Sequence, residues 1–336
     1  MNIVNVKKPL YGCRQFTITG IDKSFVNGLR RTLLGNIPIL VMKAVDCDIT
    51  VNTSRFTNEI IKDRLASIPI NQKLSGNKPI TVTVSKKNTT TNVIFVTTED
   101  FDTPVYEPTI IPNFPGKHFI DFIRLRPGEE IQLTCTSSIG TSNESGMYNS
   151  VGTCSFNNTH DKNASDAEWN STPRESRADW ELLEAKRFSI PNSFDFIMET
   201  IGTYTNDELL LYAGFILKNQ FDACQKPKNI IASPSTIHDC FDVTITGDYF
   251  AFDTEFKLNG DYTTGKMIEY AIYKRFKNPI TYVAYFKRHP HDTTGILRVA
   301  YPNATRESVE ELINDVCKEC IVLVNTFTQL IKTLSE

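Results

Sequence analysis

The C-terminal end of the chain carries the pattern that most restricts its fold. From about Thr305 onward, apolar residues recur at steps of three and four, which is the spacing of one face of an α-helix. This stripe consists of Val309, Leu312, Ile313, Val316, Cys320, Val324, Phe327, Ile331 and Leu334. So long a stripe needs a long partner helix to bury it. A candidate partner follows the N-cap residue Thr205, with apolar residues again at helical spacing, namely Leu209, Leu210, Ala213, Ile216 and Leu217. We therefore predict that helices at 205–221 and 305–334 pack together.

The composition is typical of a soluble globular protein. Of the 336 residues, 40% are hydrophobic and 22% are charged, and the mean hydropathy is -0.25. The net charge of -3 and the pI near 6.0 give the chain as a whole no electrostatic attraction to nucleic acid or to an anionic membrane. The length allows two or three domains, each with its own core.

The termini and cysteines predict an intracellular, reducing location. The opening residues MNIVNVKKPLYGCRQ lack the apolar core of a signal peptide, and no apolar run approaches the ~18 residues that cross a bilayer. The eight cysteines show no pairing rhythm, which favours free buried thiols over a disulfide framework.

Strand-like and helix-like segments alternate along the chain, which predicts an α+β fold. Residues 1–45 have the pattern of a strand, a helix and a second strand. The range 46–185 is richer in strands, because CDITV, PITVTVS, NVIFVTT, FIDFIRL and EIQLTCT alternate apolar and polar residues with period two. Within this range, the Ser/Asn/Thr-rich residues 140–174 predict a long surface loop.

The second half of the chain repeats the opening pattern. Residues 186–221 predict a strand and a helix, and residues 222–238, with two prolines and little periodicity, predict a linker. The range 239–336 then gives strands at DVTITG and TEFKLNG, a helix over 263–276, strands at TYVAYF and GILRVAY, and the long final helix.

The segment SFVNGLRRTLLGNIPI places two adjacent arginines on a short amphipathic helix over 24–36. At about 100° per residue, its apolar residues occupy roughly a third of the circumference. Arg30 then falls beside the apolar stripe and Arg31 nearly opposite it. A solvated polar face and a contact with a partner protein both explain this pair.

The stretch GDYTTGK spells the G-x-x-x-x-G-K pattern of a phosphate-binding loop between a strand and a helix. Such a loop requires Ser or Thr after its lysine to hold magnesium, and this chain has Met267. Too few residues follow for the rest of a nucleotide-binding sheet. An ordinary helix-entry loop is therefore favoured, with a nucleotide-binding enzyme that uses Lys266 as the alternative.

A zinc site formed by Cys317, Cys320, His289 and His291 can also be considered. The two cysteines lie within the helical stripe, where core positions explain them more simply than metal ligation does. No nucleophile or paired carboxylate accompanies the histidines, so a charged turn explains them better than acid/base catalysis does. We predict no metal, no cofactor and no catalytic residue.

The fragment NGLRRTLLGNIPILVMKAVDCDITVNTSRFTNEIIKDRLASIPI resembles the N-terminal core of alpha-type subunits of multisubunit RNA polymerases, most closely the third subunit of archaeal and nuclear enzymes. The shared features are an N-A-L-R-R-like helix and a second helix with E-x-x-x-x-R-L-x-x-I-P. These are carried here by Asn27, Gly28, Leu29, Arg30, Arg31, Glu59, Arg64, Leu65, Ile68 and Pro69.

From Asp242 onward, the chain resembles the eleventh subunit, the smaller alpha-like partner. The residues DYTTGKM stand where that family has D-H-T-L-G-N-L, and the segment 282–301 is similar to its paired strands. The resemblance therefore implies a natural fusion of two alpha-like subunits, as in large DNA viruses that carry their own transcription enzyme. Two dimerisation domains, 1–45 with 186–221 and 239–336, would flank an insert domain over 46–185 and a linker over 222–238.

The implied function is that of an assembly platform in a DNA-dependent RNA polymerase. The resemblance implies docking of the two largest catalytic subunits, together with a small zinc-binding subunit, and no direct sequence-specific nucleic-acid or membrane binding. The implied contact residues are Asn27, Arg30, Arg31, Glu59, Arg64, Asp261, Thr264 and Lys266. The implied dimerisation contacts between the halves are Leu209, Ala213, Ile216, Leu217, Val316, Cys320, Val324 and Phe327. The implied location is the virion and the host cytoplasm, with the nucleus as the alternative. A stand-alone protein-binding module is a further alternative.

Overall fold

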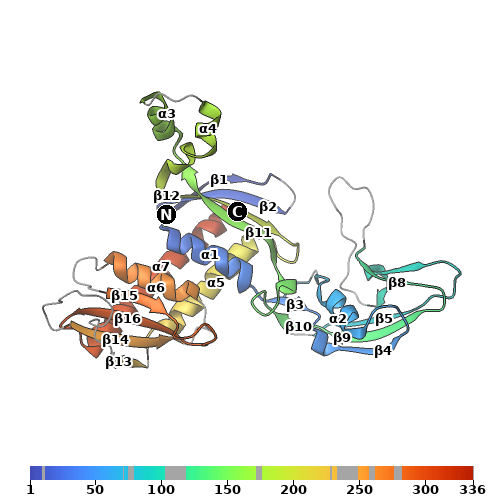
Figure 1. Cartoon of the computed structure of the whole chain (residues 1–336). Helices are drawn as coiled ribbons and strands as arrows, with labels where there is room; N and C mark the ends of the chain where they lie inside the picture. The colour runs from blue at the N-terminus through green and yellow to red at the C-terminus, as the bar shows by residue number, and fades with distance from the viewer. Residues whose placement is uncertain are drawn as a thin grey trace.

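The computed structural model has an α+β architecture with two similar halves, a strand-rich unit and a small helical appendage (Figure 1). It describes residues 1–9, 12–70, 72–74, 79–102, 119–171, 176–227, 229–232, 249–256, 262–275 and 282–335.

The first half consists of one antiparallel sheet and two helices. Its strands are β1 (Asn2–Lys7), β2 (Cys13–Thr19), β11 (Val151–His160) and β12 (Ser189–Thr200), in the order β1-β2-β12-β11. Helix α1 (Lys23–Gly35) follows β2, and helix α5 (Asn206–Cys224) follows β12. The Asp22 side chain caps α1 by accepting hydrogen bonds from the backbone N–H groups of Ser24 and Phe25, at 2.9 and 3.3 Å.

The second half has the same order of elements. Its strands are β13 (Ile230–Ala232), β14 (Tyr249–Phe256), β15 (Tyr282–Phe286) and β16 (Gly295–Pro302), in the order β13-β14-β16-β15. Helix α6 (Tyr262–Arg275) follows β14, and helix α7 (Arg306–Ser335) follows β16. Both halves are therefore ββαββα units with equivalent strand orders, which is an internal duplication of the fold.

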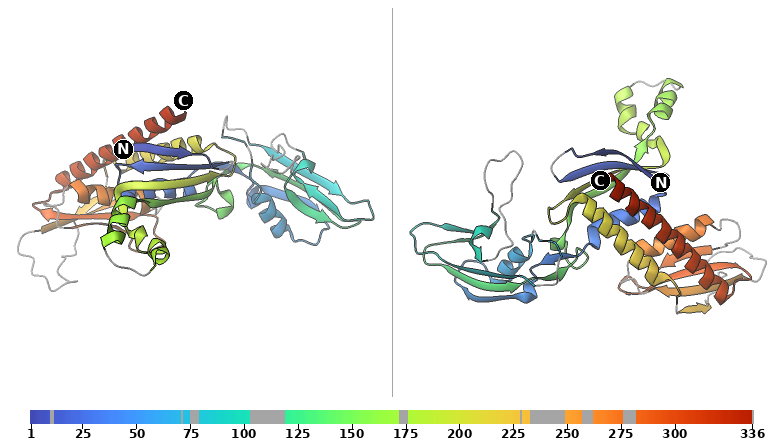
Figure 2. Two further views of the ribbon diagram at one scale, coloured as in Figure 1. Left: turned by 90° about the horizontal axis from the view of Figure 1, so that it is seen from above. Right: turned by 180° about the vertical axis from the view of Figure 1, so that it is seen from behind.

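The long helices α5 and α7 pack side by side, as the apolar stripes predict (Figure 2). Their buried residues have matching spacing: Leu209, Leu210, Ala213, Gly214, Leu217, Phe221 and Cys224 in α5, and Leu312, Ile313, Val316, Cys317, Cys320, Val324 and Phe327 in α7. A Cβ atom on Gly214 would overlap the Thr328 side chain, so the two backbones approach closely there. The halves consequently share one hydrophobic core.

A second core lies in the strand-rich unit, which we define as β4 to β9. It contains β4 (Cys47–Asn52), α2 (Asn58–Ala66), β5 (Thr81–Lys87), β6 (Ile94–Thr97), β7 (Phe101–Asp102), β8 (Asp121–Leu125) and β9 (Glu130–Thr136). The sheet order is β4-β9-β5-β7, and β6 pairs with β8. The short pair β3 (Ile39–Val41) and β10 (Ser138–Gly140) leads into and out of this unit. Alternate residues along β3 enter the two cores, because successive strand side chains point to opposite faces.

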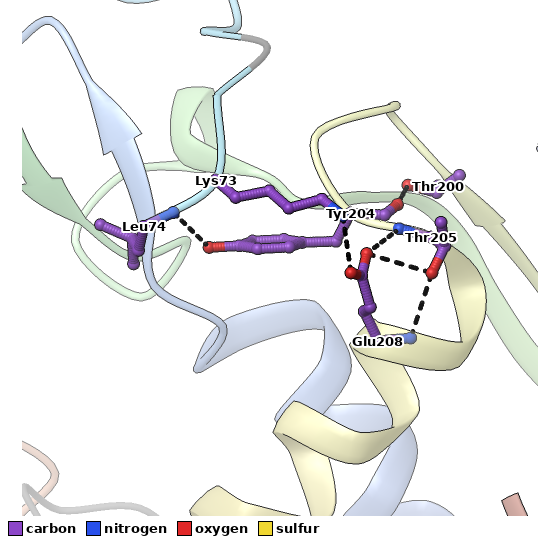
Figure 3. Close-up of polar contacts among 6 residues, drawn as sticks. All are labelled: Lys73, Leu74, Thr200, Tyr204, Thr205 and Glu208. Atoms are coloured by element: carbon purple, nitrogen blue, oxygen red, sulfur yellow. Dashed lines mark hydrogen bonds and ion pairs between the residues drawn. The ribbon is translucent and has the colours of Figure 1, made fainter. Parts of the chain in front are cut away.

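Hydrogen bonds and an ion pair connect the strand-rich unit to the start of α5 (Figure 3). The buried Tyr204 hydroxyl donates to the carbonyl of Pro38 at 3.3 Å and accepts from the backbone N–H of Leu74 at 3.4 Å. Lys73 forms an ion pair with Glu208 at 2.6 Å, and Glu208 also closes the capping box with Thr205. These contacts tie the chain after α2 to the N-terminus of α5.

The prediction of a long surface loop over 140–174 is wrong for most of its length. Strand β11 pairs with β12 along the first-half sheet, and α3 (Lys162–Ser171) follows it. As the edge strand of the sheet, β11 keeps a polar outer side, so its hydrophobic pattern is weak. The appendage, residues 161–188, also contains α4 (Arg177–Leu182), and Trp180 packs between Trp169 and Phe188. Long-range pairing and one aromatic cluster therefore order a stretch whose composition is typical of a loop.

Some predicted boundaries fall within elements of the structure. Strand β11 lies in the range 46–185 but belongs to the first-half sheet. In the predicted linker 222–238, α5 continues to Cys224 and β13 begins at Ile230. The strand predicted at DVTITG lies outside the described residues.

Candidate subunit interface on α1 and α6

Helices α1 and α6 are the equivalent helices of the two halves, and they pack against each other. A Cβ atom on Gly28 would overlap the Met267 sulfur, which shows how closely the helices approach. Arg31 extends across this contact, and its Nε donates a hydrogen bond to Thr263 Oγ1 at 2.8 Å. Helices α1 and α6 therefore lie side by side (Figure 1), and we consider their exposed sides together as one candidate surface.

On α1, Asn27 orients Arg30. The Asn27 side-chain oxygen accepts hydrogen bonds from Arg30 Nε and Nη2, at 3.2 and 3.0 Å. Both residues, together with Lys23, line a cavity of about 450 Å³ whose other wall is β11, residues 154–158. Among the lining residues that the structure describes, there are two cations and no carboxylate. This arrangement suits a carboxylate or carbonyl group from a partner, because guanidinium groups pair with such oxygens across interfaces.

Arg31 is exposed, as its position opposite the apolar stripe predicts, and it makes a contact that the helical wheel does not show. Its side chain extends from α1 to α6 and donates to Thr263 Oγ1. The sequence could not show this, because the contact joins residues that are far apart along the chain. Arg31 therefore links the two halves as well as facing outward.

The α6 residues named by the resemblance have different environments. Thr264 is fully buried, and its hydroxyl donates to Gln220 Oε1 of α5 at 2.7 Å, so its side chain serves an internal contact and does not face a partner. Lys266 is exposed and forms an ion pair with Glu269 at 2.6 Å. Asp261 lies outside the described residues.

Glu59 and Arg64 lie on α2, in the strand-rich unit, and not beside α6 (Figure 1). Arg64 Nε donates to the Phe122 carbonyl at 2.7 Å, so this guanidinium joins α2 to β8. Glu59 is exposed, and hydrogen bonds from its own backbone N–H and from Thr57 lower the pKa of its carboxyl. Any contact that these two residues make with a partner would form a second surface, separate from that of α1 and α6.

The sequence analysis missed an aromatic face on α6. Tyr262, Tyr270 and Tyr273 are between 38% and 50% exposed and lie on the same side of the helix as Lys266. Exposed tyrosines are typical of protein–protein interfaces. The spacing of these tyrosines is visible in the sequence, but which side of α6 stays exposed depends on how the helix packs.

The structure gives Gly265 a packing role. A Cβ atom on Gly265 would overlap the ring of Tyr285, which is 1% exposed, and a Cβ on Gly295 would overlap the same ring. The space beside Gly265 is thus filled by an aromatic ring where a phosphate-binding loop would need room for its ligand. This favours the helix-entry reading of GDYTTGK over the nucleotide-binding alternative.

Gly265→Ala is expected to destabilise the protein by about 1–3 kcal/mol, because the added methyl group overpacks against Tyr285. Thermal or chemical denaturation measures this change. The double variant Gly265→Ala/Tyr285→Leu should recover part of the loss, since leucine leaves space for the methyl group. An unchanged stability for Gly265→Ala would contradict the packing role.

Cys317 and Cys320 lie in the core of α7, near Cys224 of α5. Burial raises the pKa of Cys224 and of Cys320 to about 12, so these thiols stay protonated at neutral pH. Within the described ranges, no group of three or more His, Cys, Asp or Glu residues is placed to hold a metal ion. The described helices also include none with the length and apolar character needed to span a membrane.

The residues expected to join the halves lie in one core. Of the eight residues named for this role, seven are buried in α5 and α7, and the eighth, Ile216, is half-buried against the same core. Phe327 also reaches α1, where its ring meets Phe25 edge-on with 5.7 Å between centroids. The helices of both halves therefore contribute to a common dimerisation core.

The two ββαββα units are joined through their long helices, and a second pair of helices faces outward. This arrangement defines an alpha-type dimerisation protein. The chain belongs to the RNA polymerase Rpb3/Rpb11 dimerisation domain family, which matches residues 15–221.

Similar proteins include the DNA-directed RNA polymerase subunit Rpo3 of three archaea. The protein of Methanosphaera stadtmanae is 25% identical over 158 residues, which is 42% of this chain and 55% of that protein. The protein of Pyrococcus furiosus is 27% identical over 133 residues, 38% of this chain and 48% of that protein. The protein of Pyrobaculum aerophilum is 26% identical over 139 residues, 38% of this chain and 51% of that protein. The chain thus spans about half the length of the curated relatives it matches.

Proposed function

We propose that this chain is a non-catalytic assembly subunit of a multisubunit DNA-dependent RNA polymerase, in which one polypeptide replaces an alpha-type dimer. The observation that carries this proposal is the duplicated ββαββα unit, whose equivalent helices α1 and α6 pack into one outward surface. The family match and the Rpo3 relatives support the polymerase context.

The proposal includes a fusion of a third-subunit-like half with an eleventh-subunit-like half. A covalent connection supports intramolecular pairing, because it raises the effective concentration of one half near the other to about millimolar. A viral source, with a virion and host-cytoplasm location or a nuclear one, stays a prediction from the resemblance.

The two largest catalytic subunits are the proposed partners, together with a small zinc-binding subunit. Asn27, Arg30 and Arg31 on α1 and Lys266 on α6 are the proposed contacts on the shared surface, with Glu59, Arg64 and Asp261 as further proposed contacts. Thr264 is excluded because its side chain is buried.

Arg30→Ala is expected to weaken assembly with a large subunit by about tenfold, as loss of an arginine interface anchor typically does. The fold should persist, because the Arg30 side chain donates these hydrogen bonds to Asn27 on the same helix. These bonds therefore do not join α1 to another element. Co-purification of tagged chain with co-expressed large subunits measures the effect. Arg306→Ala is the matched control, since Arg306 is an exposed arginine at the start of α7. Equal recovery of the large subunits by both variants would show that Arg30 is not an interface residue.

Affinity purification from the native source tests the proposal as a whole. Recovery of large polymerase subunits with the chain is the expected result, and their absence would favour a stand-alone binding module. Lys266→Ala distinguishes the assembly subunit from the nucleotide-binding enzyme. Loss of nucleotide binding with intact assembly would contradict a purely scaffolding role.

A further inference from the structure

An open groove lies where α6, α7 and the start of α1 meet. Its volume is about 410 Å³. Its apolar lining is formed by Phe25, Met267, Ala271, Cys320 and Leu323, and its polar lining by Asp22, Ser24, Tyr270, Lys274, Arg275 and Glu319. The innermost side chains, Phe25 and Met267, are only 1% and 5% exposed. The groove therefore has an apolar floor and a charged rim.

The corresponding place in the first half is bridged by polar side chains. Because the fold is duplicated, each residue around the groove has an equivalent residue in the other half. Phe25 corresponds to Thr264, Tyr270 corresponds to Arg31, and Leu323 corresponds to Gln220. Thr264 donates to Gln220 at 2.7 Å, and Arg31 donates to Thr263 at 2.8 Å. Polar side chains thus bridge α1, α5 and α6 at the position where the second half keeps an apolar opening.

The charged side chains of the rim indicate which chemical group of a partner would bind in the groove. Arg275 is engaged by Asp315 and Glu319, at 3.5 and 3.4 Å. The Asp22 carboxylate caps α1. Lys274 is exposed and has no ion-pair partner among the described residues, so it is the lining cation that can pair with a partner, although the carboxylates of Asp22 and Glu319 line the same groove. The complementary group is a carboxylate next to a bulky apolar side chain.

A polypeptide fits this surface better than a small ligand does. Tyr270 lines the groove and is 38% exposed, and Tyr273, about one turn further along α6, is 50% exposed. A row of exposed tyrosines beside an apolar pocket is the arrangement of an interface anchor site. A small molecule would fill the pocket and leave this aromatic face uncovered.

We infer that the groove receives a bulky apolar side chain of one large polymerase subunit, with a neighbouring Asp or Glu of that subunit paired to Lys274. This inference rests on the proposed function. It also makes the two halves chemically distinct, because α1 offers a cationic cavity formed by Lys23 and Arg30 and α6 offers an apolar one.

The test uses the full chain co-expressed with the two largest subunits. Ala271→Trp fills the groove, and Val322→Trp is the matched control on the outer side of α7, where Val322 is 63% exposed. Lys274→Glu reverses the rim charge, and Lys332→Glu is its control on an exposed lysine in the last turn of α7. A photo-crosslinking benzoylphenylalanine in place of Tyr270 identifies the residue that occupies the groove. Circular dichroism melting curves confirm that each variant is folded.

We expect Ala271→Trp and Lys274→Glu to lower recovery of one large subunit at least tenfold, while the other remains bound and both controls behave as wild type. The crosslink should map to a segment of the lost subunit with a bulky apolar residue beside Asp or Glu. Wild-type recovery of both subunits by folded groove variants would overturn this inference and leave the proposed function intact. A crosslink to a second copy of this chain, or to a segment without such a residue pair, would also overturn it. Failure of the wild-type chain to recover any large subunit would instead defeat the proposed function.

Discussion

Replacement of Phe327 by alanine is expected to lower the free energy of unfolding by about 3–5 kcal/mol, the range measured for buried Phe→Ala changes. Phe327 lies on α7, is 0% exposed and meets Phe25 of α1 edge-on. Its removal would leave a cavity in the core that the two halves share, and close packing allows little relaxation there. Urea denaturation measures the loss.

The matched control is Phe215→Ala on α5, because Phe215 is 59% exposed. We expect its effect to stay within about 0.5 kcal/mol, as for most surface substitutions. The variants should also differ in cooperativity, since loosening the shared core is expected to let the halves unfold at different denaturant concentrations. Similar small losses for both variants would show that α7 does not hold the halves together through this residue.

Asp253→Ala is expected to destabilise the protein by about 2–4 kcal/mol, because it leaves a partly buried guanidinium without its acceptor. Asp253 and Arg298 are directly opposite on β14 and β16 and form a bidentate pair, with Nε–Oδ1 and Nη2–Oδ2 distances of 2.7 and 2.8 Å. Their side chains are 6% and 23% exposed. The hydrogen bonds from Arg298 to Asp253 raise the pKa of the guanidinium further, so it stays charged at any working pH.

Two further variants show whether the loss arises from the unpaired charge. Asp253→Leu/Arg298→Met removes both charges and should recover much of the stability, because an apolar pair of similar size often replaces a buried ion pair without loss. Asp166→Ala breaks an exposed pair with Arg177 and should cost at most about 1 kcal/mol. If Asp253→Ala lowers the free energy of unfolding no more than Asp166→Ala does, the Asp253–Arg298 pair does not stabilise the second sheet.

Periodic patterns in the sequence predicted the long helices and most strands. The stripe on α7 and the capped apolar segment of α5 identified the central helix pair, because helix amphipathicity is a local property that survives in one sequence. Strands β5 and β9 alternate in burial along their length, so their period of two was also visible. Edge strand β11 was missed because only its pairing with β12 makes it a strand.

The candidate site was predicted only in part. The arginines of α1 were found, but the contact of Arg31 with Thr263 and the burial of Thr264 depend on how α1, α5 and α6 meet. The groove beside Tyr270 was not predicted, since its lining comes from three segments that are distant along the chain. Residue type and spacing identify a helix face, but they do not say which neighbouring element covers it.

The sequence alone predicted the long helices, most of the strands, and the pairing of α5 with α7, because apolar periodicity within one segment is a local property, whereas it missed α3 in the stretch predicted as a loop. Tertiary structure alone decided how the two equivalent places around α1 and α6 differ. Both halves provide equivalent helices there, but the polar pair Thr264 and Gln220 forms a hydrogen bond across one place, whereas the apolar Phe25 and Leu323 line the groove at the other. That difference arises from contacts between distant residues, and such contacts exist only once the chain has folded.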